Sequence, residues 1–263
     1  MNLGNKLRKL LYKQLSFEQY LKVLSCLYFF AYYTRLLKNH PPSQYPYFIK
    51  KIVKKNDVVI DIGANMGYYT CLFARWIGKS GKVYAVEPVE PVRNVLINNT
   101  KKYSQVTVVP FALGKENKPI QMGNNTLKKK GFVASGSHFV IDIANNSEAV
   151  ENPEIVFQVE MKKGSELFAN LKKLDIIKCD VEGYEMVIIP EIIDIITKFY
   201  PTIIIETGSD NRLKITKLLF EIGYLAFVVE SRKLRTLLPD DTMDILFIHK
   251  ENALMINRDI FLT

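Results

Sequence analysis

Apolar runs alternate with helical patterns along most of the chain, and this alternation is the first guide to its fold. The apolar runs are short and rich in valine and isoleucine, and they lie at residues 58–62, 82–87, 106–110, 175–180 and 202–207. Apolar residues between them repeat at the spacing of one helix face, at residues 67–77, 91–101 and 215–222. Buried strands separated by helices predict an α/β fold, with a mostly parallel sheet that helices cover on both faces.

The last two apolar runs depart from this pattern because few residues separate them. They are YLAFVVE at 224–230 and MDILFIH at 243–249. A connection this short joins antiparallel strands, since parallel neighbours need a longer crossover. We therefore expect an antiparallel final pair, and we expect ligands at the carboxyl ends of the parallel strands, where such sheets bind them.

A long insertion follows the third strand, at about residues 115–165. It is rich in polar and small side chains and contains three short extended runs, PIQM, HFVIDI and IVFQVEM. Its place in the chain is that of a lid over the substrate, although it could also form an ordinary sheet edge. We expect this insertion to be part of a single main domain that spans residues 47–263.

Residues 1–46 differ from the rest and are expected to form a helical N-terminal extension. Leucines recur at helical spacing in MNLGNKLRKLLYKQL, with basic residues between them, and HPPSQYP at 40–46 is the expected linker. The apolar run at 20–33 is shorter than the ~20 residues of a membrane span. The helices either cap the main domain or lie on an anionic membrane as a basic amphipathic anchor. We favour the cap, because tyrosine-rich helices with mixed faces are typical of protein cores.

Composition narrows the function classes further. The 263 residues are 48% hydrophobic and 24% charged, which fits one large core and excludes a disordered chain. The formal net charge of +9 suits an acidic partner, but no basic run interleaved with aromatic residues predicts nucleic-acid binding. Cys26, Cys71 and Cys179 lack metal-type spacing and are expected to be buried free thiols. This indicates a reducing compartment, hence a cytoplasmic protein, peripheral on the inner membrane face if the extension is an anchor.

The sequence VIDIGANMGYYT joins the first strand to a helix through a glycine turn. A dinucleotide-binding turn needs three glycines, but Asn65 occupies the second glycine position and Tyr68 the third. A triphosphate-binding loop needs a Lys-Ser/Thr pair after the turn, and no such pair follows. The remaining pattern, Gly63-x-Asn65-x-Gly67, can bring backbone amides close to a carboxylate or a ribose, although many strand–helix connections contain glycine. Glu87 ends the second strand, where a carboxylate can accept both hydroxyls of a ribose. Together these features indicate S-adenosylmethionine.

Five stretches of the chain carry a resemblance to a known family: VIDIGANMGYYT, VEPVEPVRNVLINN, VPFALG, IIKCDVEGYE and PTIIIET. They resemble the FkbM-type family of S-adenosylmethionine-dependent methyltransferases, most specifically in KCDVEGYE at 178–185. The resemblance implies a Rossmann-like class I methyltransferase fold with a seven-stranded sheet. It also implies the cofactor contacts: Asp61, Gly63, Asn65, Gly67 and Thr70 for the methionine end, Glu87 and Pro88 for the ribose, and Phe111 and Ala112 for the adenine.

Methyl transfer from a sulfonium to a hydroxyl requires an aligned acceptor and a group that takes its proton. Asp180 ends its strand and can face the cationic cofactor, while Glu182 in the following turn can orient or deprotonate the acceptor. Both acids could instead cap and start the next helix, which is an ordinary structural role. His138, in the insertion, is a third candidate as the base.

A divalent metal ion is the remaining cofactor to consider. Asp180, Glu206 and Asp210 are oxygen ligands at similar levels of the sheet. We expect no metal, because Glu206 is explained more simply as a strand-end acid that precedes a helix.

The sequence thus predicts an S-adenosylmethionine-dependent O-methyltransferase that modifies a hydroxyl of a glycan or a secondary metabolite. One alternative is a non-catalytic, cofactor-binding adaptor on a membrane surface, which the pair Asp180 and Glu182 argues against. Another is a nicotinamide-dependent oxidoreductase, which Asn65 and Tyr68 argue against. The sequence carries no signature of the oligomeric state.

Overall fold

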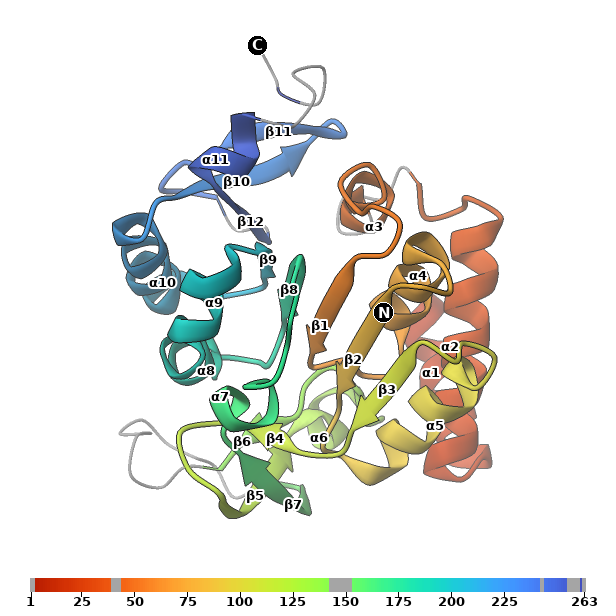
Figure 1. The fold of residues 1–263 in the computed structure, drawn as a ribbon. Helices are drawn as coiled ribbons and strands as arrows, with labels where there is room; N and C mark the ends of the chain where they lie inside the picture. Colours follow the sequence, from red (N-terminus) through yellow and green to blue (C-terminus); the bar gives the residue numbers. More distant parts are fainter. Residues whose placement is uncertain (1–2, 39–43, 142–152, 242–243, 255–260, 262–263) are drawn as a thin grey trace.

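The computed structural model describes residues 3–38, 44–141, 153–241, 244–254 and 261, and it has the predicted α/β architecture (Figure 1). Its centre is an eight-stranded sheet with the order β11-β10-β12-β9-β8-β1-β2-β3. The strands are β1 (Val58–Ile62), β2 (Lys82–Val86), β3 (Val106–Val109), β8 (Ile176–Cys179), β9 (Thr202–Ile205), β10 (Tyr224–Glu230), β11 (Lys233–Thr236) and β12 (Ile245–His249). Strand β12 is antiparallel to both β9 and β10, which confirms the predicted antiparallel pair.

The sheet has one strand more than the seven that the resemblance implies. The extra strand, β11, forms an edge hairpin with β10. Its two-residue turn holds Ser231 and Arg232 at φ of 48° and 63°. Such turns usually contain asparagine or glycine, so this hairpin has no ordinary turn signature in the sequence.

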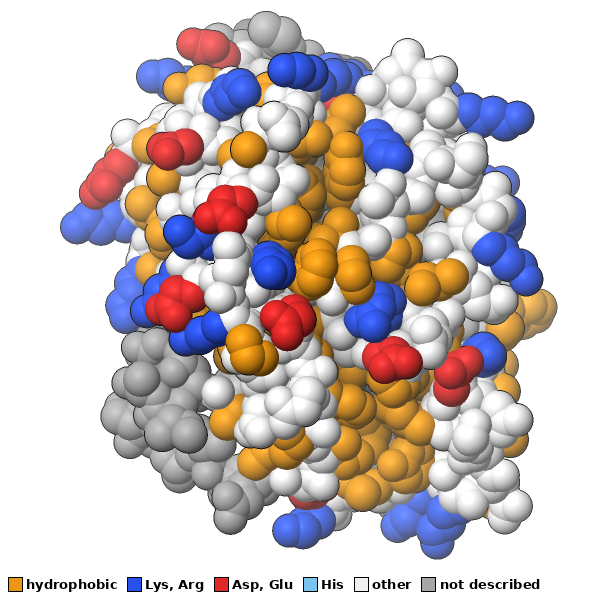
Figure 2. Space-filling view, turned by 60° about the horizontal axis from the view of Figure 1, so that its bottom comes forward, with side chains coloured by type: hydrophobic (Ala, Val, Ile, Leu, Met, Phe, Trp, Pro, Cys, Tyr) orange, Lys and Arg blue, Asp and Glu red, His pale blue; other side chains and the backbone are white. Residues whose placement is uncertain are grey.

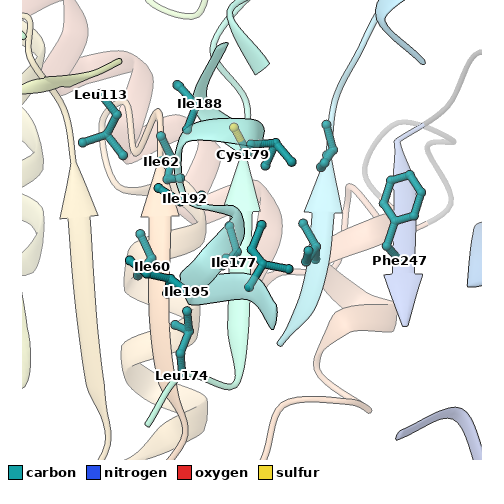
Figure 3. Packing of buried hydrophobic residues seen from close by; sticks show 14 of the residues in the cluster. Ile60, Ile62, Leu113, Leu174, Ile177, Cys179, Ile188, Ile192, Ile195 and Phe247 are labelled. Atoms are coloured by element: carbon teal, nitrogen blue, oxygen red, sulfur yellow. The ribbon is translucent and has the colours of Figure 1, made fainter. Parts of the chain in front are cut away.

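Helices cover both faces of the sheet, because neighbouring residues of each strand point to opposite sides. On one face, Ile60 and Ile62 of β1 pack with Ile188 and Ile192 near α8 (Figure 3). On the other face, Val59 of β1 packs with helices α3 and α4. The helices of the main domain are α3 (Gln44–Ile49), α4 (Tyr68–Ile77), α5 (Glu90–Thr100), α6 (Thr126–Lys130), α7 (Gly164–Leu167), α8 (Glu185–Glu191), α9 (Ile193–Phe199), α10 (Ser209–Glu221) and α11 (Lys250–Leu254).

A second sheet has four strands in the order β4-β7-β5-β6, of which β5, β6 and β7 belong to the insertion and β4 lies just before it. Its strands are β4 (Ala112–Leu113), β5 (Lys118–Asn124), β6 (Phe139–Val140) and β7 (Ile155–Lys162). The three runs that the sequence marks as extended overlap β5, β6 and β7, and residues 142–152 lie outside the described residues. This small sheet lies at the lower edge of Figure 1, towards which β1, β2 and β3 point.

Residues 3–38 form two helices, α1 (Leu3–Gln14) and α2 (Phe17–Tyr33). Ser16 and Gln19 make a capping box that starts α2. Tyr20 and Leu21 of α2 are fully buried in a cluster with Val92 of α5. Part of the expected linker at 40–46 lies outside the described residues, and its end belongs to α3.

Two sequence predictions concern single features of the described chain. No helix among the described residues is both long and apolar enough to cross a membrane. Cys71 and Cys179 are buried free thiols as expected, but Cys26 is exposed on α2, so the prediction of burial was wrong for that cysteine.

Candidate active site

The turn after β1 needs its two glycines for reasons of packing. Gly63, Asn65 and Gly67 all have positive φ, at 76°, 51° and 87°. A Cβ atom on Gly63 would lie 1.9 Å from the carbonyl oxygen of Asp180, and one on Gly67 would lie 2.9 Å from the Leu96 side chain. The turn therefore touches the loop after β8 backbone to backbone, a contact that a larger residue would prevent.

Glu87 follows β2 and holds this turn with its carboxyl group. Its Oε2 accepts a hydrogen bond from the Asn65 amide, and its Oε1 accepts one from the Val89 amide, both at 2.9 Å. The side chain is buried, and burial raises the pKa of Glu87 to about 7, although the two amides oppose that rise. Each carboxylate oxygen has a second lone pair, so Glu87 can still accept two hydroxyl groups.

Asp61 and Thr70 form a buried pair beneath the turn. The Thr70 hydroxyl donates to Asp61 Oδ2 at 2.6 Å, and Asp61 is fully buried. Burial raises the pKa of Asp61. Its other oxygen, Oδ1, has no hydrogen-bond partner among the described residues, so it can accept one from a ligand.

A cavity, called the first cavity below, opens beside Glu87. The turn, β4, the insertion and the loop after β8 all contribute to its wall, which is mostly apolar. Figure 2 looks onto the edge of the molecule at the bottom of Figure 1 and shows apolar side chains gathered through the middle of that face.

The two predicted adenine contacts, Phe111 and Ala112, divide at the first cavity. Ala112 lines it, as does Pro88, a predicted ribose contact. Phe111 does not line it, and its ring instead packs against the main core, 5.8 Å from Lys162 Nζ. Phe111 lies in a bend just before β4, whereas Ala112 begins that strand. Leu113 lines the cavity and was not predicted.

The insertion contributes His138 to the first cavity. The imidazole is buried, its Nδ1 lies 2.8 Å from the Ser135 carbonyl oxygen, and its ring contacts Phe157 edge to face. Burial lowers the pKa of His138, which favours the neutral ring with its proton on Nδ1. Its Nε2 has no partner among the described residues and is therefore available as an acceptor.

A second cavity shares Gly63, Asn65 and Asp180 with the first. Lys178 Nζ lies 2.8 Å from Asp180 Oδ2 and 4.9 Å from the centre of the Tyr69 ring. Burial opposes the charge of this lysine, but the neighbouring carboxylates of Asp180 and Asp61 outweigh it and raise its pKa.

Two more carboxyl groups, Glu206 and Asp244, line the second cavity. Burial and the negative charge of Asp180 raise the pKa of Glu206 to about 7, and burial raises that of Asp244 to about 6. Sequence reasoning missed Asp244. Because β12 is antiparallel, the residue that precedes it lies at the edge where the parallel strands end. An acid just before the antiparallel strand is the signal that could have found it.

Asp180 and Glu182 lie in the loop after β8, and neither has the helix-capping role considered from sequence as an alternative. Helix α8 begins at Glu185 with Tyr184 as its cap, so neither Asp180 nor Glu182 caps it. Glu185 Oε1 instead accepts the amides of Val181 and Gly183, both at 3.2 Å. Glu182 lines the first cavity with φ of 53°. Burial of its carboxyl group and the charge of Asp180 raise its pKa to about 7, although much of the residue is exposed.

The family model of the methyltransferase FkbM domain matches residues 61–226. These residues include the glycine turn that both cavities share, Glu87 and the loop after β8. The chain belongs to the FkbM methyltransferase family. This confirms the resemblance that the sequence motifs carry.

Individual relatives of this FkbM chain match over shorter stretches. Fibrillarin 3 of Arabidopsis thaliana, named as an rRNA 2′-O-methyltransferase, is 29% identical over 129 residues, which are 42% of this chain and 44% of the relative. A protein-L-isoaspartate O-methyltransferase of Methanosarcina mazei is 42% identical over 53 residues, 19% of this chain and 22% of the relative. The solved methyltransferase FkbM of Methylobacillus flagellatus has a TM-score of 0.49 and 16% identity, over 74% of this chain and 44% of that one. The chain thus spans less than half of each of these proteins.

The FkbM chain brings most of the predicted site residues to one place. Gly63, Asn65, Glu87, Pro88, Ala112, His138, Asp180 and Glu182 line the first cavity, and Asp61 lines the second. Gly67, Thr70 and Phe111 line neither of these two cavities. For the metal question, no three or more candidate ligands among the described residues are arranged so that they could hold a metal ion, and the side chain of Asp210 lies outside the described part.

Proposed function

We propose that this FkbM chain is an S-adenosylmethionine-dependent methyltransferase that modifies a hydroxyl of a glycan or a small metabolite. The observation that carries the proposal is Glu87. It is a buried carboxyl group at the end of the second strand, tied to the glycine turn and open to an apolar cavity. An adenosine group has a planar ring that suits such apolar walls and a ribose that suits such a carboxylate.

The residues present fit this cofactor. Ala112 would face the adenine, Glu87 and Pro88 would hold the ribose, and Asn65 and Asp61 would hold the methionine end. The free oxygen of Asp61 in the second cavity supports that last assignment, because a buried acceptor without a partner is costly. When bound, S-adenosylmethionine supplies an activated methyl group on a sulfonium.

Asp180 is the residue we expect to favour that positive charge. It lines both cavities and therefore lies where they meet. The Lys178 ammonium group fixes its orientation at 2.8 Å. With Asp61, Glu206 and Asp244 nearby, the carboxyl groups outnumber the one lysine of the second cavity, so the site favours a cationic ligand.

A hydroxyl acceptor also loses a proton, and Glu182 is our proposed base. Its pKa of about 7 lets it take a proton near neutral pH. Glu206 has a similar pKa in the second cavity and is the other carboxyl group that the pH experiments below must distinguish. His138 is the third candidate, through its free Nε2.

The remaining segments receive roles in the same proposal. Met122, Ser135 and His138 of the insertion line the first cavity, which supports a lid at about residues 115–165. Tyr28 of α2 lines the second cavity, which supports residues 1–46 as a cap on the main domain at 47–263.

The test is a search for the acceptor with a radiolabelled methyl donor. Native protein and Asp180→Asn are incubated with fractionated cell extract, and the labelled fraction is treated with alkali. We expect label from the native protein alone, in a product that alkali leaves intact, as a methyl ether is. Alkaline release of methanol would indicate a carboxyl acceptor. If the native protein binds the cofactor but labels no fraction, the result would favour the alternative of a non-catalytic adaptor.

A further inference from the structure

A second concave surface lies away from the active site and is strongly basic. Eight of its fifteen lining residues are cationic: Arg35, Lys38, Lys50, Lys51, Lys55, Arg75, Arg232 and Lys233. No acidic residue lines it in the described part of the chain, and none of these eight forms an ion pair there. We call this surface the basic groove. Uncompensated charge of one sign attracts an anionic partner.

The fold builds the basic groove from segments that are distant in the sequence. The end of α2, the segment after α3, helix α4 and the β10–β11 turn all meet there. Tyr32 and Tyr47 stack with ring centres 4.7 Å apart, and Arg75 lies 5.2 Å from the Tyr33 ring centre. Lys51 Nζ donates to the Arg232 carbonyl oxygen at 3.1 Å.

The backbone at two of its arginines is strained. Arg35 and Arg232 have φ of 64° and 63°, a region that residues with side chains adopt at a cost. Both values belong to local turns, since Arg35 follows the C-cap of α2 and Arg232 lies in the β10–β11 hairpin turn. The proposal therefore rests on the charge of the groove and on the apolar surface beside it.

An apolar stripe borders the basic groove on α2 and the turn after it. Leu27, Phe30 and Tyr33 are spaced three residues apart on the outer face of the helix, and Leu36 follows. Phe30 is 63% exposed and Leu36 is 70% exposed. Tyr33 also lines the groove, so the two surfaces are continuous. We call these four residues the apolar stripe.

We propose that the basic groove and the apolar stripe together dock this protein on an anionic phospholipid surface. Phosphate groups of the lipids would meet the cations, and the stripe would enter the boundary between headgroups and acyl chains. A nucleic acid would use the cations but would leave a row of exposed leucine and phenylalanine side chains without a partner. This surface differs from the anchor considered from sequence, because the segment after α3 and the β10–β11 hairpin supply five of its eight cations.

Vesicle flotation with the full chain tests the proposal. The native protein should float with vesicles that contain phosphatidylglycerol and not with pure phosphatidylcholine. The double variant Lys50→Glu with Lys55→Glu should bind at least about thirtyfold more weakly, because each cation near such a surface contributes about a factor of five. Phe30→Ala should weaken binding about tenfold through lost apolar burial.

Matched controls come from α10, which lies far from α2 at the opposite side of Figure 1. Lys214→Glu with Lys217→Glu changes the net charge equally, and Phe220→Ala removes a phenylalanine that is 70% exposed. Both should bind as the native protein does. Thermal unfolding by circular dichroism checks that each variant is folded.

Three results would overturn the proposal. The first is that the native protein does not bind the anionic vesicles, or that the α10 controls lose binding to the same extent. The second is that the groove variant loses binding to a single-stranded RNA while Phe30→Ala leaves vesicle binding unchanged, which would make the groove a nucleic-acid site. The third is a native dimer that Phe30→Ala converts to a monomer, which would make the stripe a contact between two copies.

Discussion

The two cavities of the active site share a turn and differ in almost everything else. The first has apolar walls and one deeply buried carboxyl group, Glu87, whose hydrogen bonds tie it to the backbone. The second holds four carboxyl groups, one lysine and several tyrosines. A planar, largely uncharged group suits the first cavity, and a cationic or proton-donating group suits the second. The comparison teaches that one glycine turn can hold the two halves of a single ligand in unlike surroundings.

The largest effect should come from breaking the contact that both cavities share. Gly63→Ala would place a methyl group 1.9 Å from the Asp180 carbonyl oxygen, so the turn and the loop after β8 must separate. We expect a loss of about 4 kcal/mol or more in the free energy of unfolding, measured by chemical denaturation. Gly208→Ala is the control, since a Cβ there meets nothing within 4 Å. Native-like stability of Gly63→Ala would contradict the tight contact.

The next largest effect should be on kcat and should come from Asp180, which lies where the two cavities meet. Asp180→Asn keeps the size of the side chain and an oxygen for Lys178 but removes the negative charge. We expect kcat to fall about a hundredfold or more, because a charge aimed at the reacting cation is lost. The exposed Asp194→Asn on α9 should leave kcat unchanged. Undiminished turnover in Asp180→Asn would show that the charge of Asp180 has no part in the reaction.

The pH dependence decides which cavity supplies the base. A carboxylate base works only when deprotonated, so kcat/KM should rise about tenfold per unit below a pKa of about 7 and level off above it. We expect Glu182→Gln to remove this rise and Glu206→Gln to leave it. The opposite result would move the base to the second cavity, since Glu206 has a similar pKa. A native profile without any rise would exclude both carboxyl groups.

The smallest effect concerns the insertion. His138→Ala removes one neutral hydrogen-bonding group from the first cavity. If His138 contacts the cofactor and not the acceptor, the affinity for the cofactor should fall by about 1 kcal/mol while kcat stays within a few-fold of native. A collapse of kcat with unchanged affinity would make His138 the base instead.

The sequence predicts the first cavity better than the second, and the reason is local. Gly63, Asn65 and Glu87 belong to turns that directly follow strands, so their order along the chain already places them at one edge. Phe111 shows the limit of this reasoning, because it follows β3 as closely as Ala112 does, yet it lies in a bend and packs against the main core.

The second cavity depends on long-range geometry. Asp244 reaches it because β12 runs against its neighbours, and Tyr28 reaches it because α2 packs on α5 through Tyr20 and Leu21. Both residues are placed by packing between distant segments, which periodicity along the chain does not encode. The eighth strand was missed for a local reason instead, since its turn at Ser231 and Arg232 lacks glycine.

The central claim is that the first cavity holds the adenosine part of S-adenosylmethionine against Glu87. Titration calorimetry with S-adenosylhomocysteine tests it most directly, on native protein, Glu87→Ala and the neighbouring control Glu90→Ala, whose side chain is exposed on α5. We expect binding by the native protein and by the control, and a loss of about 1–3 kcal/mol in Glu87→Ala, the value of charge-assisted hydrogen bonds. Equal affinity of all three proteins, or no binding by the native protein, would contradict the claim.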